Sequence, residues 1–200
     1  HYCVYAPDLR GHGDSDWALG SMYSLPEFVL DVATLAATLS EGKTSRLYRA
    51  LIDTNLAISA SASKGFFHDP TLFNATAMLA PGSTHDQVEK TLLVEIEKVK
   101  KDGVTPAEVS RAINKLLAGI AYQRDGSFAI AGQINEAIAV GDWTYYTGLL
   151  EKLKTVTAAD VQRVAKAYCN EDQSTTGWFI PQAEAPAKSA GILPAHESSE

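Results

Sequence analysis

The chain has 200 residues, of which 46% are hydrophobic, and its formal net charge is -7. This length allows one domain with a single core, and the acidic balance excludes the positive field that nucleic acid or an anionic membrane attracts. No apolar run reaches the length of a membrane-spanning helix and no signal segment opens the chain, so we expect a soluble protein. The two cysteines, Cys3 and Cys169, lie far apart and predict neither a disulfide framework nor a zinc site.

The first part of the chain predicts a mixture of strands and helices. Aromatic and β-branched residues indicate a strand at 2–6, and Ser24 with Glu27 forms a capping box that opens a helix from about 25 to 40. A second short helix is expected at 45–53. Residues 56–63 and 72–80 have strand composition, and the Asp-Pro turn between them indicates an antiparallel pair. The core of that pair is expected to contain Phe66, Phe67 and Phe73.

Helices dominate the second part. Ser83 is expected to cap a helix at 85–101, and Thr105, Pro106 and Glu108 give a strong start signal for the next one. Further helices are expected at 123–140, with an interruption near Gly126, at 143–153 after an Asp142 cap, and from Thr157 to about Cys169. A last strand is expected at 174–180. The Ala-, Pro- and Ser-rich residues 182–200 are expected to form a disordered tail.

This order of elements predicts the fold class. It is typical of an α+β domain with helices packed on one face of a largely antiparallel sheet. We expect residues 1–181 to form this single domain.

One set of segments resembles the insulinase/pitrilysin family of zinc peptidases over residues 31–181. The segments are Leu39-Ser-Glu-Gly-Lys-Thr-Ser-Arg-Leu-Tyr-Arg-Ala-Leu51, Ala80-Pro-Gly82, Lys101-Asp-Gly-Val-Thr105, Gly141-Asp-Trp143 and Val156-Thr-Ala-Ala-Asp-Val-Gln-Arg-Val-Ala165. Several matches in the family's order make the signal specific. The resemblance implies an insulinase-type peptidase domain of the kind that follows the zinc-binding domain and cradles substrate.

The first 35 or so residues resemble a different family. Tyr5-Ala-Pro-Asp-Leu-Arg-Gly-His-Gly-Asp-Ser-Asp16 is similar to the strand and loop that precede the nucleophile elbow of α/β-hydrolases. The two likenesses meet near residues 32–39, which suggests a chimeric reading frame. The hydrolase-like strand and helix have the order and polarity to replace those of an insulinase-type domain. We therefore expect the chain to fold, and we expect deletion of residues 1–20 to unfold it.

The zinc chemistry of the insulinase family is not expected here. The resemblance implies an H-x-x-E-H helix motif in active members, but no two of the five histidines are three or four residues apart. His85 and Glu89 lie one helical turn apart and are more simply explained as a solvated first turn. The Arg and Tyr that the family places near the substrate carbonyl are replaced by Ile52 and by Ile58 or Ser59. We expect no cofactor, although the parent family uses zinc.

Two other groups of residues are candidates for a site. Ser15, with His12 and Asp14, has the residue types of a serine hydrolase, but neighbours in a short loop cannot easily hold the geometry of a triad. Tyr122, Arg124 and Trp143 are candidates for lining a peptide-binding concavity, although core packing explains them equally well.

The leading hypothesis is a non-catalytic, substrate-cradling half of an insulinase-type zinc metallopeptidase. We expect it to bind peptide substrates and to form a homodimer or pair with a zinc-bearing peptidase domain. We expect no nucleic-acid or membrane partner. The alternatives are an esterase-like serine hydrolase, which Ser15→Ala would test, and an inactive chimeric fragment.

Overall fold

The computed structural model describes residues 2–7, 25–65, 71–141 and 143–181. Its elements in chain order are β1 (Tyr2–Pro7), α1 (Leu25–Ser40), the π-helical turn η1 (Tyr48–Ile52), β2 (Ala57–Lys64), β3 (Phe73–Leu79), α2 (His85–Asp102), α3 (Pro106–Tyr122), α4 (Ser127–Val140), α5 (Thr144–Lys154), α6 (Ala158–Tyr168), the 3-10 turn η2 (Glu171–Gln173) and β4 (Ser174–Phe179).

The described strands form one four-stranded sheet in the order β2-β3-β1-β4. All of its pairings are antiparallel, and β1 lies in the interior of the sheet because it pairs with both β3 and β4. Strands β2 and β4 are therefore the two edges of the sheet within the described part of the chain. The strand predicted at the N-terminus is confirmed. It lies between β3, from the middle of the chain, and β4, from near its C-terminal end.

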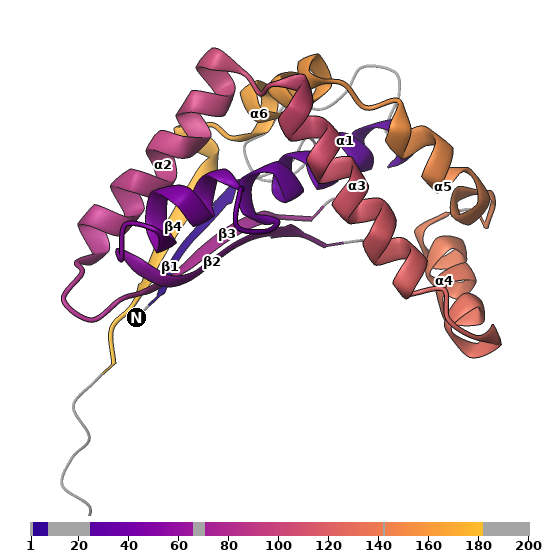
Figure 1. The fold of residues 1–200 in the computed structure, drawn as a ribbon, viewed down its shortest axis with the longest axis horizontal. Coiled ribbons are helices and arrows are strands. Elements are labelled where there is room, and N and C mark those ends of the chain that lie inside the picture. The colour runs from indigo at the N-terminus through magenta and orange to yellow at the C-terminus, as the bar shows by residue number, and fades with distance from the viewer. Residues whose placement is uncertain (1, 8–24, 66–70, 142, 182–200) are drawn as a thin grey trace, which may run out of the picture.

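Helices cover one face of this sheet, and the core lies between the two layers (Figure 1). Along β3 every second side chain, from Phe73 to Leu79, is buried, while the intervening ones are only half-buried. Helix α1 packs against β2, α3 and α6, and α2 packs against α6 and against the strands β1 and β3. The alternation of buried and half-buried side chains along β3 is what a sheet with helices on one side requires. The predicted α+β fold class is confirmed.

The segment 39–51, which carries the strongest resemblance, supplies the centre of the core. Leu39, Leu47 and Leu51 are fully buried at 0% exposure. Gly42 ends α1 with a φ of +83°, a left-handed conformation that glycine adopts without steric cost. Segment 39–51 therefore has a structural role: its leucines pack in the core, and Gly42 forms the turn that follows α1.

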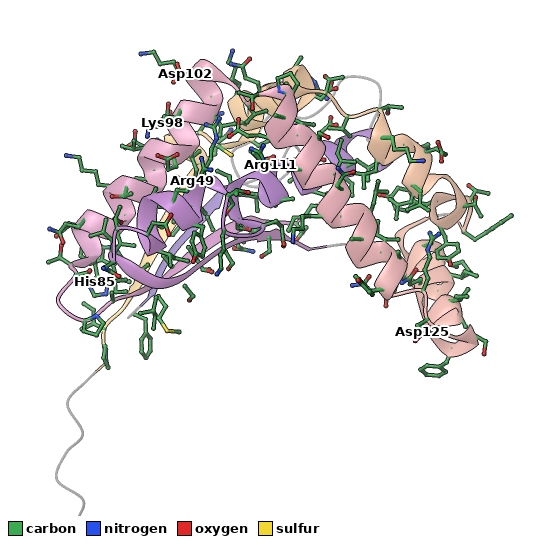
Figure 2. All side chains as sticks on the ribbon, in the orientation of Figure 1. Arg49, His85, Lys98, Asp102, Arg111 and Asp125 are labelled. Carbon is green, nitrogen blue, oxygen red and sulfur yellow. The ribbon has the colours of Figure 1, made fainter. Side chains whose placement is uncertain are left out.

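The segment from the end of α3 to α5 forms an arm that extends away from the sheet (Figure 1). Helix α4 lies at the outer end of this arm, and among the described elements its main packing partner is α5. Figure 2 shows Asp125 at the tip of the arm, while His85 lies at the opposite side of the molecule, beside the sheet. The molecule thus has a two-layer body and a one-layer arm.

One local prediction needs correction and one needs refinement. The cap of α2 is Thr84, not Ser83, because the Thr84 side chain accepts from the backbone N–H of Gln87 and the Gln87 side chain accepts from the N–H of Thr84. The helix expected at 45–53 contains the π-helical turn η1, in which the N–H of Asp53 donates to the carbonyl of Tyr48.

The interruption expected near Gly126 is confirmed, since Gly126 has a φ of +84° and helix α4 begins at Ser127. The Asp142 cap, the Ser24 box, Phe66 and Phe67 lie outside the residues whose side chains the structure describes.

Candidate functional site

The serine-hydrolase candidates cannot be placed. Ser15, His12 and Asp14 all lie outside the described residues. Among residues 2–7, 25–65, 71–141 and 143–181, no group of three or more His, Cys, Asp or Glu side chains is arranged to hold a metal ion. In the same part of the chain, no helix is long and apolar enough to cross a membrane.

His85 and Glu89 have a structural use that the sequence analysis missed. The imidazole of His85 stacks on the indole of Trp178, with ring centroids 5.3 Å apart, and the indole N–H of Trp178 donates to Glu89 at 2.9 Å. The pair on α2 therefore holds the edge strand β4 against the helix layer. The expectation of a merely solvated first turn is wrong, because the Trp178 partner is 89 residues from Glu89 and only the fold brings it there.

Arg46 holds the end of α2 against the start of α3. Its Nε donates to Glu108 Oε1 at 2.8 Å, and its Nη2 donates to the other Glu108 oxygen and to the carbonyl of Gly103. Glu108 also accepts from the backbone N–H of Thr105, so the same carboxylate closes the capping box of α3. Burial by itself would raise the pKa of Glu108, but the hydrogen bonds from Arg46 and Thr105 lower this pKa to about 2.

Burial shifts the pKa values of three side chains, and for Tyr145 on α5 it raises the pKa to about 12. Lys64, at the end of β2, has its pKa lowered to about 8, because removal from water penalises the ammonium form. Cys169 is 3% exposed, and burial raises the pKa of its thiol to about 12. A thiol with so high a pKa is a poor nucleophile, so Cys169 serves as a core residue.

The edge strand β2 pairs only with β3 among the described strands, and it contains the positions where the family's Tyr would fall. Ile58 is 57% exposed, and Ser59, Ser61 and Ser63 are exposed as well. The hydroxyls of Ser61 and Thr76 lie 2.8 Å apart across the β2–β3 pair. Ile58 and Ser59 carry no cationic or phenolic donor, so this edge offers backbone groups and small side chains to a ligand.

The three predicted peptide-contact residues all lie on the arm. Tyr122 is 85% exposed and Trp143 is 55% exposed, so neither is a core residue. Arg124 is occupied internally: its guanidinium lies 4.2 Å from the centre of the Tyr146 ring, and its Nη2 donates to the Tyr146 carbonyl at 3.1 Å. Arg124 therefore joins the end of α3 to α5 and leaves the two aromatic rings accessible.

The sequence analysis missed two exposed apolar residues on the same arm. Phe128 is 93% exposed and Ile138 is 55% exposed, and both belong to α4. A signal was present in the sequence, because α4 has Glu136 as its single charged residue and no polar stripe of the kind that surface helices usually carry.

Residues 27–116 match the family described as the peptidase M16 inactive domain. An inactive peptidase domain from Bordetella parapertussis has the same fold, with a TM-score of 0.75 and 29% identity over 92% of this chain and 94% of that chain. In this segment and in its fold, the chain is similar to the peptidase M16 inactive domain. This similarity agrees with the resemblance of residues 31–181 to the insulinase/pitrilysin zinc peptidases.

Two curated proteins that resemble this chain are longer than it. Zinc protease PqqE of Helicobacter pylori is 27% identical over 172 residues, which cover 83% of this chain and 38% of the relative. The uncharacterized zinc protease SCO5738 of Streptomyces coelicolor is 27% identical over 168 residues, which cover 83% of this chain and 34% of the relative. The chain thus spans little more than a third of each relative.

The comparisons lend no support to the α/β-hydrolase resemblance of the first 35 residues or to a chimeric origin. The structural match to the Bordetella parapertussis domain covers 92% of this chain. An esterase-like function is therefore not favoured over the M16 assignment.

Proposed function

We propose that this M16 inactive-type domain is a non-catalytic wall that holds an extended peptide for a zinc-bearing domain of the same family. In this proposal residues 1–181 form the wall domain and residues 182–200 form a tail outside it. The partner supplies the zinc and the attacking water, and this chain supplies binding surface. The observation that carries the proposal is an accessible edge strand on a sheet whose helices cover only one face.

Strand β2 suits the addition of a peptide strand. An edge strand presents backbone N–H and C=O groups along its outer side, and an extended peptide pairs with them whatever its sequence. The small side chains of Ser59, Ser61 and Ser63 leave room beside the strand, and Ile58 offers one apolar contact. A substrate held in this way is bound mainly through its main chain, which fits a domain that cradles many different peptides.

The arm provides a second contact region in this proposal. Tyr122 and Trp143 present rigid aromatic surface, which binds apolar side chains at little cost in conformational entropy. Arg124 acts as a positioning residue, because its contacts with Tyr146 connect the two segments that carry those rings.

The catalytic part of the proposal is tested by zinc content and peptide cleavage. The purified chain should contain no stoichiometric zinc and should not cleave a quenched fluorescent peptide with or without a chelator. Addition of a zinc-bearing M16 domain should restore chelator-sensitive cleavage. Stoichiometric zinc in the chain alone, together with chelator-sensitive turnover, would overturn the proposal.

The binding part is tested at the strand edge. We expect Ile58→Asp to weaken the binding of an extended fluorescent peptide by about tenfold, because a charge beside the edge must be desolvated when a strand adds. Val94→Asp is the matched control, since Val94 is 43% exposed but lies on α2. Equal affinities for the two variants would show that β2 is not the binding edge.

A further inference from the structure

The face of the sheet that the helices leave uncovered is neutral beside the β2 edge. Residues directly opposite one another in antiparallel strands share a face of the sheet, and successive residues of a strand alternate between faces. Since the buried residues of β3 face the helices, the register assigns six residues of β2 and β3 to the uncovered face: Ser59, Ser61, Ser63, Asn74, Thr76 and Met78. None of these six is ionisable, and Met78 is the one large apolar residue among them.

A β-bulge adds Ile58 to this face. Strand β2 pairs with β3 in one continuous register from Ser59 to Lys64, and the register shifts by one residue between Ala57 and Ser59. Ala57 is buried, whereas Ile58 and Ser59 are both exposed, so the alternation is interrupted at the bulge. Ile58 and Ser59 therefore lie on the same side of the sheet and are both opposite Met78.

Ile58 and Met78 form an apolar site at one end of the regular edge, and hydroxyl groups follow it. Ile58 is 57% exposed and Met78 is half-buried. Ser59, the register partner of Met78, has a small side chain, so a long side chain added at the edge can reach across it. A thioether adapts its shape to different apolar groups. Farther along, the hydroxyls of Ser61 and Thr76 form an exposed pair at 2.8 Å.

We infer that Ile58 and Met78 form a specificity site for one large apolar side chain of a peptide added at β2. This inference rests on the proposed binding of peptides to that edge. A peptide strand pairs with the regular stretch 59–64, and its side chains on the uncovered face recur at every second residue. The residue at the bulged end is therefore apolar, and those two and four positions away lie beside Ser61 and Ser63.

The peptide residues beside Ser61 and Ser63 are small and uncharged. No strand residue of β2 or β3 on this face carries a charge that would compensate the partial desolvation of an ionised side chain. The substrate class is thus an extended segment with one large apolar residue at an end, followed at alternate positions by small neutral residues. Main-chain pairing supplies general affinity, and the apolar end selects among peptides.

The test measures fluorescence anisotropy of labelled hexapeptides of alternating Ser and Thr with the full chain. One guest residue, Leu, Ser, Asp or Lys, stands at the first or at the last position in separate peptides. The Leu guest should bind about tenfold more tightly than the Ser guest at one of the two ends, because apolar contact is the only difference between them. Asp and Lys guests should bind no more tightly than Ser.

Two results with the guest peptides would overturn the inference. The first is equal affinity for the Leu and Ser guests at both ends. The second is a preference for the Lys guest, which would assign the contact to the carboxylate of Asp53 in the turn before β2.

Variants of the chain locate the apolar site. Met78→Thr removes the thioether but keeps a residue that favours strands, and it should abolish most of the Leu preference while leaving the affinity for the Ser guest unchanged. Val94→Thr is the matched control, since Val94 is 43% exposed on α2. Equal Leu preferences in these two variants would place the apolar contact elsewhere.

A gain of binding guards against a variant that only disturbs the fold. Ser61→Leu adds an apolar side chain two residues along the same face, so a peptide with a second Leu two positions from the first should bind this variant about fivefold more tightly than it binds the unchanged chain. An unfolded variant cannot show such a gain, and an unchanged affinity would contradict the assigned face.

Ile58→Asp separates this inference from the proposed function. If Ile58→Asp weakens the binding of every peptide but the Leu and Ser guests do not differ, the edge is right and the specificity site is wrong. If Ile58→Asp changes no affinity, or if no peptide binds, the edge itself is wrong and both proposals are overturned.

Discussion

The body and the arm of this domain are both rich in apolar residues, yet they bury them very differently. In the body, Leu47 and Phe73 are at most 1% exposed because the helix layer and the sheet enclose them from both sides. In the arm, Ala137 of α4 is buried at 3% exposure, while Phe128 of the same helix is 93% exposed. The body has two layers and a core between them, whereas the arm has one layer.

This difference shows that apolar content alone does not stabilise a segment. Burial of a side chain stabilises the fold only where another layer removes its surface from water. The arm therefore has apolar surface available for a partner, and large exposed apolar patches on soluble proteins commonly mark interaction sites.

The largest expected effect comes from removing the strand that completes the body. Deletion of residues 1–20 removes β1, which lies between β3 and β4 and pairs with both. We expect the shortened chain to lose cooperative unfolding in urea and its near-ultraviolet circular dichroism. A deletion variant that unfolds at the same urea concentration as the full chain would show that β1 is dispensable.

A pair of phenylalanine truncations compares the two regions directly. Phe73→Ala should lower the free energy of unfolding by about 3–5 kcal/mol, because it leaves a cavity in the core. Phe128→Ala should change it by no more than about 0.5 kcal/mol in the monomer, because that ring is solvated. Urea denaturation at low protein concentration measures both, and similar losses at the two positions would contradict the contrast between body and arm.

The Arg46 clamp should have an intermediate effect. Arg46→Met should lower the free energy of unfolding by about 1–3 kcal/mol, because Glu108 and the Gly103 carbonyl lose charged hydrogen bonds in a half-buried site. Arg49→Met serves as control, since Arg49 is exposed and lies three residues further on. Chemical denaturation of both variants in parallel gives the difference.

The pH dependence of stability should reveal the same clamp with a smaller effect. The folded-state pKa of Glu108 is lowered from an ordinary 4.5 to about 2, so its stabilisation is complete above pH 4.5 and is lost as the pH falls toward 2. Glu108→Gln should flatten the pH profile of the unfolding midpoint in that window. Glu151→Gln, at an exposed ion pair with Lys154, should leave the profile as steep as before.

Local signals predicted the elements whose start is set by neighbouring residues. The boxes at Thr105 with Glu108 and at Thr157 with Asp160 are confirmed, because an N-cap is formed by side chains three residues apart. The cap of α2 was misplaced by one residue because Ser83 and Thr84 are both good caps, and local sequence does not distinguish them.

Predictions about the site were harder, because they depend on contacts between distant segments. Trp178 meets His85 and Glu89 only because β4 returns to the sheet beside α2. The ion pair of Arg46 joins residues 62 positions apart, so its partner Glu108 follows only from the fold. The peptide contacts assigned to Tyr122 and Trp143 remain predictions.

The sequence by itself determined the α+β class and most helix starts, because these follow from the short-range spacing of caps, turns and apolar residues. Its resemblance to the insulinase-type peptidases came from matching segments such as 39–51 and 156–165. Only the tertiary structure decided that β1 lies inside the sheet, that β2 and β4 are its edges, and that α4 keeps an uncovered apolar face. The physical reason is that burial and strand pairing are set by neighbours in space, and the same apolar side chain is a core residue in one layer and an interface residue in another.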